Sequence, residues 1–103
     1  MNTNRRIIML PKDTAFRAVD NEAVILHLGS GNYYSLNHVG KRMFELVQNG
    51  ICEVDEIIEK IAAEYKVDSA MVKNDIEELV TDLVRENLIE IRTDLRAAAS
   101  PKE

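Results

Sequence analysis

The stretch from Ala23 to Leu36, AVILHLGSGNYYSL, constrains the fold more than any other part of the sequence. An apolar run and a tyrosine-containing run are separated by Gly29-Ser30-Gly31, and glycine readily takes the positive φ of a tight hairpin loop. The β-branched and aromatic residues on both sides favour extended strands. The sequence therefore predicts a β-hairpin here, in a small sheet with one face covered by the rest of the chain.

Because side chains alternate between the two faces of a strand, the first strand of this hairpin has one wholly apolar face and one partly apolar face. The wholly apolar face holds Val24, Leu26 and Leu28, and the other holds Ala23, Ile25 and His27.

The second strand of the hairpin, residues 33–36, ends at Asn37, and no further strand signal occurs before Ile89. We therefore expect residues 33–36 to lie at a sheet edge with unpaired backbone groups. Such an edge can accept an additional strand, which makes it the first candidate for a binding site.

The segments before the hairpin complete a small sheet. Residues 14–19 (TAFRAV) alternate enough for a short strand, and Asp20-Asn21 is a turn signal, so we predict a three-stranded antiparallel meander. Residues 1–13 show no strong periodicity, and Pro11 marks a break. They are expected to form an irregular, flexible arm.

Three amphipathic segments follow, and the first predicts a helix from about Asn37 to Gln48. Asn37, just before this helix, can cap it, because an asparagine side chain accepts a hydrogen bond from a free backbone N–H of the first turn. Gly40 lies inside this helix, where glycine costs about 1 kcal/mol relative to alanine. Its presence suggests that another element comes close at this point.

The second and third helices are predicted over about 54–65 and from a capping Asp68 to about Asn87. The second has a weak start, because Glu53 stands where a Ser or Thr would cap better. The third has an apolar stripe that is wide for a helix with a single packing partner. Part of that stripe is therefore available as the wall of a groove.

The end of the chain completes the predicted organisation. Residues 88–92 alternate like a short strand or a tail along the core, whereas residues 93–103 lack a core pattern and are expected to be frayed. We predict one α+β domain over residues 14–92, with a three-stranded antiparallel β-meander followed by a three-helix bundle.

Composition excludes several classes of protein. One cysteine permits no intrachain disulfide, and the N-terminal apolar run is too short for a signal peptide or a membrane span, so a cytoplasmic location is expected. The net charge is −5, and residues 53–86 hold eleven acidic and four basic residues, a net −7. This balance argues against nucleic-acid binding. The acidic helices are either a solvated face or a surface that attracts a basic peptide.

The sequence offers no convincing catalytic or metal site. His27 and His38 lack acidic or cysteine neighbours at ligand spacing, and Cys52 has no histidine beside it. Gly29-x-Gly31 opens a strand and lacks the lysine of a phosphate-binding loop. We therefore expect no catalytic residue, no metal and no cofactor.

Several short motifs in fixed order resemble the PqqD family and the related RiPP recognition elements of modified-peptide pathways. They are Tyr33-Tyr34-x-Leu36-Asn37-x-x-Gly40, Val54-Asp55-Glu56-Ile57-Ile58, the aromatic-Lys-Val-Asp segment 65–68, Asp75, and Asn87-Leu88-Ile89. The resemblance covers roughly residues 14–91. It departs from the family pattern at Glu53, where a Thr or Ser is usual.

The resemblance implies a winged-helix-like domain without catalysis of its own, which binds the leader segment of a precursor peptide. The peptide adds as a strand beside the third strand, with the third helix as the other wall, and is presented to a modifying enzyme, often of the radical S-adenosylmethionine type. The peptide-binding residues implied are Asn32, Tyr33, Tyr34, Ser35 and Leu36 of the strand and Val72, Asp75, Ile76, Leu79 and Val80 of the helix.

Two other functions stay open. A structural adaptor could dock onto an enzyme through the acidic helices without binding a peptide. A winged-helix nucleic-acid binder has similar elements, but it would need a basic recognition helix. The sequence also leaves open whether the edge strand pairs in a homodimer when no peptide is bound.

Overall fold

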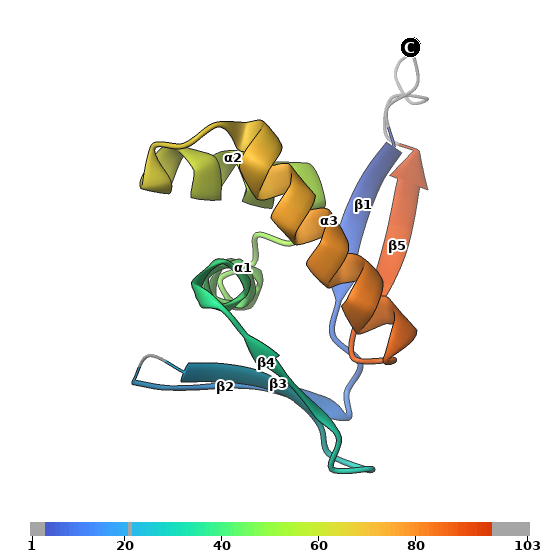
Figure 1. Cartoon of the computed structure of the whole chain (residues 1–103). Helices are drawn as coiled ribbons and strands as arrows, with labels where there is room; N and C mark the ends of the chain where they lie inside the picture. The colour runs from blue at the N-terminus through green and yellow to red at the C-terminus, as the bar shows by residue number, and fades with distance from the viewer. Residues whose placement is uncertain (1–3, 21, 96–103) are drawn as a thin grey trace.

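A computed structural model describes residues 4–20 and 22–95 of the 103-residue chain (Figure 1). Within these ranges a three-stranded sheet lies on one side of three helices, and a separate two-stranded ribbon lies beside the last helix. The arrangement confirms the predicted α+β class. The strands are β1 (Asn4–Met9), β2 (Thr14–Val19), β3 (Glu22–His27), β4 (Tyr33–Leu36) and β5 (Glu90–Leu95), and the helices are α1 (His38–Gln48), α2 (Val54–Tyr65) and α3 (Ser69–Arg85).

The three-stranded sheet has the order β2-β3-β4, with both pairs antiparallel, as predicted for a meander. Ile25 in the central strand pairs with Phe16 on one side and Tyr34 on the other, so these three side chains share a face. Asp20 takes a positive φ of 55° in the β2–β3 turn. The other residue of the predicted turn, Asn21, lies outside the described residues.

The face of the sheet that the helices cover is the partly apolar one. Ala23 and Ile25 are buried, whereas Val24 and Leu26 are only half-buried and Leu28 is exposed. The register explains this outcome, because it aligns the large side chains of Phe16 and Leu36 with Ala23 and Ile25. Counting apolar residues along one strand therefore did not identify the covered face. The neighbouring strands decided it.

The β3–β4 connection forms the predicted hairpin loop. Gly31 has a φ of +78°, and its N–H donates to the carbonyl of His27 at 2.8 Å. The His27 ring lies 2.9 Å from the Ser30 hydroxyl, so this histidine serves the loop. His38, predicted to be in the first helical turn, is the first residue of α1 and packs against the Tyr65 ring.

The helix boundaries agree closely with those expected. Asn37 caps α1 by accepting a hydrogen bond from the Gly40 N–H, and Asp68 caps α3 by accepting one from the Ala70 N–H. Glu53 makes no side-chain cap for α2, as its residue type suggested. Its carboxylate instead pairs with Arg5 at 3.3 Å.

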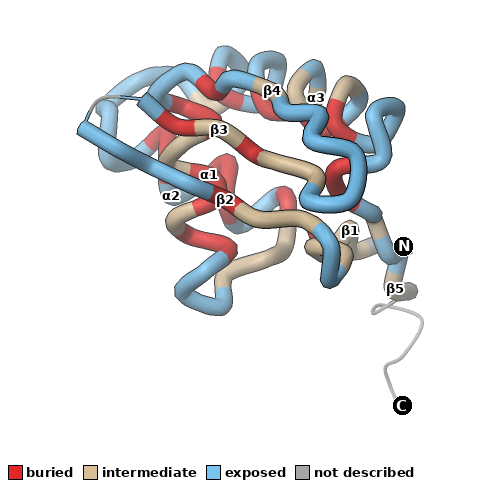
Figure 2. The backbone as a smooth tube through the Cα atoms, turned by 90° about the horizontal axis from the view of Figure 1, so that it is seen from below, coloured by how far each residue is buried: buried red, intermediate tan, exposed pale blue. Residues whose placement is uncertain are grey.

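The core lies between the sheet and the helices, with α1 in the middle (Figures 1 and 2). Phe44 of α1 is fully buried and stacks on Phe16 of β2, with 5.6 Å between the ring centroids. On the other side, α1 contacts α2 and α3. Because α1 packs on both layers, it sets the distance between the sheet and α3.

The N-terminal segment differs from the irregular arm expected for residues 1–13, because residues 4–9 form β1, antiparallel to β5. The Ile8 N–H also donates to the carbonyl of Cys52 at 2.9 Å, and Ile8 is 2% exposed. The pairing joins segments more than eighty residues apart, which a local pattern cannot reveal.

The frayed tail expected over residues 93–103 is likewise wrong for residues 93–95, which belong to β5. The remainder of that predicted tail lies outside the described residues.

An ion pair ties the ribbon to α3. Arg6 of β1 makes two hydrogen bonds to the Glu77 carboxylate, one of them 2.7 Å long between Nη1 and Oε1. Donation from Arg6 lowers the pKa of Glu77 below its ordinary value of 4.5. A lowered carboxyl pKa stabilises the folded state above the unfolded-state pKa, and this contribution is lost as the pH falls through the folded-state value.

We expect Glu77→Gln to lower the free energy of unfolding at pH 7 by about 0.5–1 kcal/mol, a modest value because the pair is partly exposed to solvent. Urea unfolding of both proteins at several pH values measures this difference. It should be constant above pH 4.5 and should shrink as Glu77 is protonated. Glu59→Gln, an exposed substitution on α2, is the control, and a Glu77→Gln difference that does not depend on pH would contradict the ion-pair interpretation.

Candidate functional site

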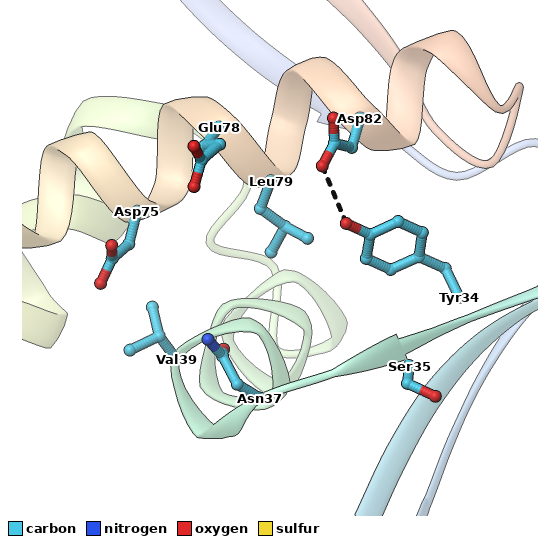
Figure 3. A pocket seen from close by; sticks show the side chains of 8 residues that line it. All are labelled: Tyr34, Ser35, Asn37, Val39, Asp75, Glu78, Leu79 and Asp82. Carbon is cyan, nitrogen blue, oxygen red and sulfur yellow. Dashed lines mark hydrogen bonds between the residues drawn. The ribbon is translucent and has the colours of Figure 1, made fainter.

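A groove runs between β4 and α3, with the start of α1 as its floor (Figure 3). Its volume is about 210 Å³. The three acidic side chains stand on the α3 wall, and the apolar side chains of Val39 and Leu79 form the floor, where Leu79 points toward α1. The residues that line it are Tyr34, Ser35, Asn37, Val39, Asp75, Glu78, Leu79 and Asp82.

Gly40 allows the walls of the groove to come this close. A Cβ atom at this position would lie 3.0 Å from a methyl carbon of Leu79 and 3.2 Å from one of Leu36, both tighter than ordinary carbon contacts. The glycine predicted to permit a close approach therefore does so, at the point where β4, α1 and α3 meet.

Tyr34 bridges the two walls. Its side chain leaves β4 on the covered face of the sheet, and its hydroxyl donates to Oδ2 of Asp82 on α3 at 2.8 Å (Figure 3). The Asp82 carboxylate raises the pKa of the Tyr34 phenol above its ordinary value of 10.0. In return, the hydrogen bond from Tyr34 and a second one from Arg85 lower the pKa of Asp82.

The backbone of β4 has free hydrogen-bonding groups along the groove. The N–H of His27 donates to the carbonyl of Asn32, so residues 27 and 32 form a hydrogen-bonded pair. Such pairs alternate along an antiparallel ladder, and the register therefore directs the backbone groups of Tyr34 and Leu36 toward β3. The backbone groups of Tyr33 and Ser35 point outward from the sheet, where the described residues supply no further strand.

The outer edge of β4 is also the sheet edge that faces α3. Seen from the uncovered face of the sheet, β4 lies on the α3 side of β3, and β2 lies on the other side (Figure 2). Unpaired backbone and the groove against α3 thus occur together along β4. The arrangement can hold an extended chain.

The family model for "Coenzyme PQQ synthesis protein D (PqqD)" matches residues 22–89, which is about two thirds of the sequence. This chain belongs to the PqqD family. The match begins at β3 and ends just before β5, so it includes both walls of the groove and excludes the β1–β5 ribbon.

Two solved structures resemble this PqqD-family chain. The first, "TbiB1 in Complex with the TbiA(beta) Leader Peptide", is 33% identical with a TM-score of 0.70, and the match covers 80% of this chain and 94% of the other. The second, "Lasso peptide synthetase B1 complexed with the leader peptide", is 26% identical with a TM-score of 0.65 and the same coverage. Among curated proteins, none matches the sequence.

In this PqqD-family chain the ten predicted site residues lie in three different settings. Tyr34, Ser35, Asp75 and Leu79 line the groove. Asn32 and Tyr33 are exposed beside it, at the start of β4. The remaining four, Leu36, Val72, Ile76 and Val80, are buried in the core.

The buried four show how the α3 stripe is used. Val72, Ile76, Val80 and Leu83 repeat at helical spacing and face the core, so most of the stripe has a partner within the chain. Only Leu79, at the edge of the stripe, lines the groove as an apolar residue of α3. A stripe that looked wide enough to leave a groove wall is therefore largely covered by α1 and α2.

Four lining residues were missed from the sequence: Asn37, Val39, Glu78 and Asp82. Asn37 was assigned only to the α1 cap, and Val39 lies within the predicted first helix. Glu78 and Asp82 were counted among the acidic residues of a surface that either is solvated or attracts a basic peptide. Their spacing from Asp75, three and seven residues along one helix, is the signal that could have placed them together.

No helix within the described ranges is long and apolar enough to cross a membrane.

The Tyr34–Asp82 bridge predicts a linked titration. We expect Asp82→Asn to lower the pKa of Tyr34 toward its ordinary value of 10.0, because the substitution removes the carboxylate that opposes ionisation of the phenol. Titration of the Tyr34 ring signals by NMR measures this change. Glu86→Gln, which removes a charge just beyond α3, is the control, and an unchanged Tyr34 pKa in Asp82→Asn would contradict the bridge.

Proposed function

We propose that this protein is a non-catalytic peptide-binding protein that captures the leader segment of a ribosomally made precursor peptide. The leader adds as a strand to the outer edge of β4 and occupies the groove against α3. The bound peptide is then presented in the cytoplasm to a modifying enzyme, of the radical S-adenosylmethionine type. The observation that carries the proposal is the unpaired edge of β4 facing a lined groove.

The comparisons support the peptide as the ligand. Both solved structures described above have a leader peptide bound, and one of them is 33% identical to this chain over most of its length. Membership of the PqqD family supports the same class of function.

The geometry of β4 sets how much the backbone alone can contribute. Tyr33 and Ser35 each direct one N–H and one carbonyl outward, enough for four ladder hydrogen bonds. At about 1 kcal/mol each, these bonds give about 4 kcal/mol, close to millimolar affinity. Burial of apolar side chains at about 1.5–3 kcal/mol each is needed to reach micromolar affinity. The ladder therefore fixes the register of the peptide, and the groove supplies the affinity.

The nucleic-acid alternative lacks support from the groove. Three of the eight lining residues are acidic and none is basic, which repels a phosphate backbone. The adaptor alternative differs from the proposal in one respect, because it does not require a peptide in the groove. The binding experiments below separate it from leader capture.

The outward direction of the Ser35 backbone N–H predicts different results for two substitutions at this position. Ser35→Pro removes an outward N–H and leaves the β3–β4 hydrogen bonds in place, since edge strands tolerate proline where the N–H faces solvent. We expect it to weaken binding of a synthetic leader peptide, from a precursor encoded beside this gene, by at least about tenfold, because it removes a ladder bond and obstructs the strand. Titration calorimetry measures the affinity.

Ser35→Ala is the matched control and should bind like the unchanged protein, because the Ser35 side chain points away from α3 (Figure 3). Circular dichroism verifies that both variants are folded. In hydrogen exchange, the peptide should slow the Tyr33 and Ser35 amides. Equal binding by a folded Ser35→Pro variant would contradict strand addition.

The groove floor predicts a second pair of results. Leu79→Ala should weaken leader binding by about 1–2 kcal/mol, roughly tenfold, because Leu79 is the apolar side chain that α3 presents to the groove. Val84→Ala shortens an apolar side chain on α3 outside the groove and should not change the affinity. Equal affinities for the two variants would remove Leu79 from the site.

A further inference from the structure

We infer that the leader segment bound by this protein carries a lysine or arginine next to an apolar residue among the side chains that face α3. The inference rests on the proposed function and specifies the chemistry of its ligand. It follows from the combination of an open strand edge, an apolar floor and an acidic wall in one groove.

The acidic wall has no internal counterion for most of its charge. Within the described residues, Asp75 and Glu78 are exposed and take part in no ion pair. Asp82 is engaged by the Tyr34 hydroxyl and by Arg85. Two carboxylates on the α3 wall are thus available to a cation that enters between α3 and β4.

The opposite wall determines which peptide side chains meet these carboxylates. Tyr34 and Leu36 project from β4 onto the covered face of the sheet, toward α1 and α3. In an added strand, the residues opposite Tyr34 and Leu36 project onto the same face. Every second peptide side chain therefore points at α3, and those between project beside Tyr33 and Ser35.

The spacings of the two elements fit one basic side chain at this wall. Asp75 and Glu78 are three residues apart on a helix, a rise of about 4.5 Å. Successive groove-facing residues of an extended strand are about 6.6 Å apart. One groove-facing lysine or arginine of an added strand can therefore lie near both carboxylates.

The floor determines the second part of the motif. Leu79 and Val39 line the groove beside the carboxylates, so a side chain that reaches across the groove toward α3 contacts apolar groups along its length and a carboxylate at its end. Lysine and arginine fit both the apolar residues and the carboxylates, because their methylene stems pack on apolar surface while the charged end reaches a carboxylate. An adjacent groove-facing position, two residues along the peptide, is filled best by an apolar side chain against Leu79.

A selection without an assumed precursor tests the motif. The full chain is immobilised and used to select from a display library of random twelve-residue peptides, and the enriched peptides are synthesised. We expect lysine or arginine two residues from an apolar residue to be enriched. These peptides should slow the Tyr33 and Ser35 amides in hydrogen exchange, and their affinity should fall as salt is raised from 50 to 500 mM.

A charge-matched pair of variants assigns the preference to the groove. Asp75→Asn with Glu78→Gln removes two charges from the α3 wall, and Glu56→Gln with Glu59→Gln removes two from exposed positions on α2. The first pair should weaken the binding of the basic peptides by about tenfold. It should not change the affinity for control peptides in which glutamine replaces the basic residue. The second pair should have little effect on either set.

The outcomes separate this inference from the proposed function. Enriched peptides that protect Tyr33 and Ser35 but lack a basic residue would uphold strand addition and overturn the charge preference. Equal effects of the two variant pairs would also overturn it, because net charge would then be the cause. A selection in which no enriched peptide protects these amides would contradict the proposed function itself.

Discussion

The packing of Leu36, Gly40 and Leu79 determines the geometry on which the site depends. The first turn of α1 lies directly between the end of β4 and the middle of α3, and the missing side chain at Gly40 lets both leucines approach its backbone. A larger residue would move α3 away from the sheet or displace β4. The width of the groove is therefore fixed by a contact in the core beneath it. The Tyr34–Asp82 hydrogen bond holds the same two walls together from above.

The short strand β4 serves two surfaces through the alternation of its residues. Tyr34 and Leu36 direct their backbone groups to β3 and their side chains to the helices, so they hold the strand in the sheet. Tyr33 and Ser35 do the opposite, since their backbone groups and side chains are free of the core. A strand of four residues can thus be anchored and still offer an open edge, because each task uses every second residue.

Charge and burial are divided along α3 in a comparable way. One side of the helix, from Val72 to Leu83, is buried in the core, and the acidic residues that line the groove lie beside it. Glu77 on yet another side binds Arg6 of the ribbon. The helix therefore connects the core, the groove and the β1–β5 ribbon. Two of its acidic residues have partners in other elements, since Glu77 pairs with Arg6 and Asp82 accepts a hydrogen bond from Tyr34.

The sequence by itself determined the elements whose signals are local. The hairpin, the caps at Asn37 and Asp68, the meander and the need for close packing at Gly40 all follow from residues within a few positions of one another. Only the tertiary structure decided three other features: the β1–β5 ribbon, the face of the sheet that is covered, and the set of residues that line the groove. The physical reason is the same in each case. These three features depend on which distant segments of the chain meet. Whether a residue is buried, like Val72 and Ile76, or exposed, like Glu78, is set by the element packed against it rather than by its own neighbours in sequence.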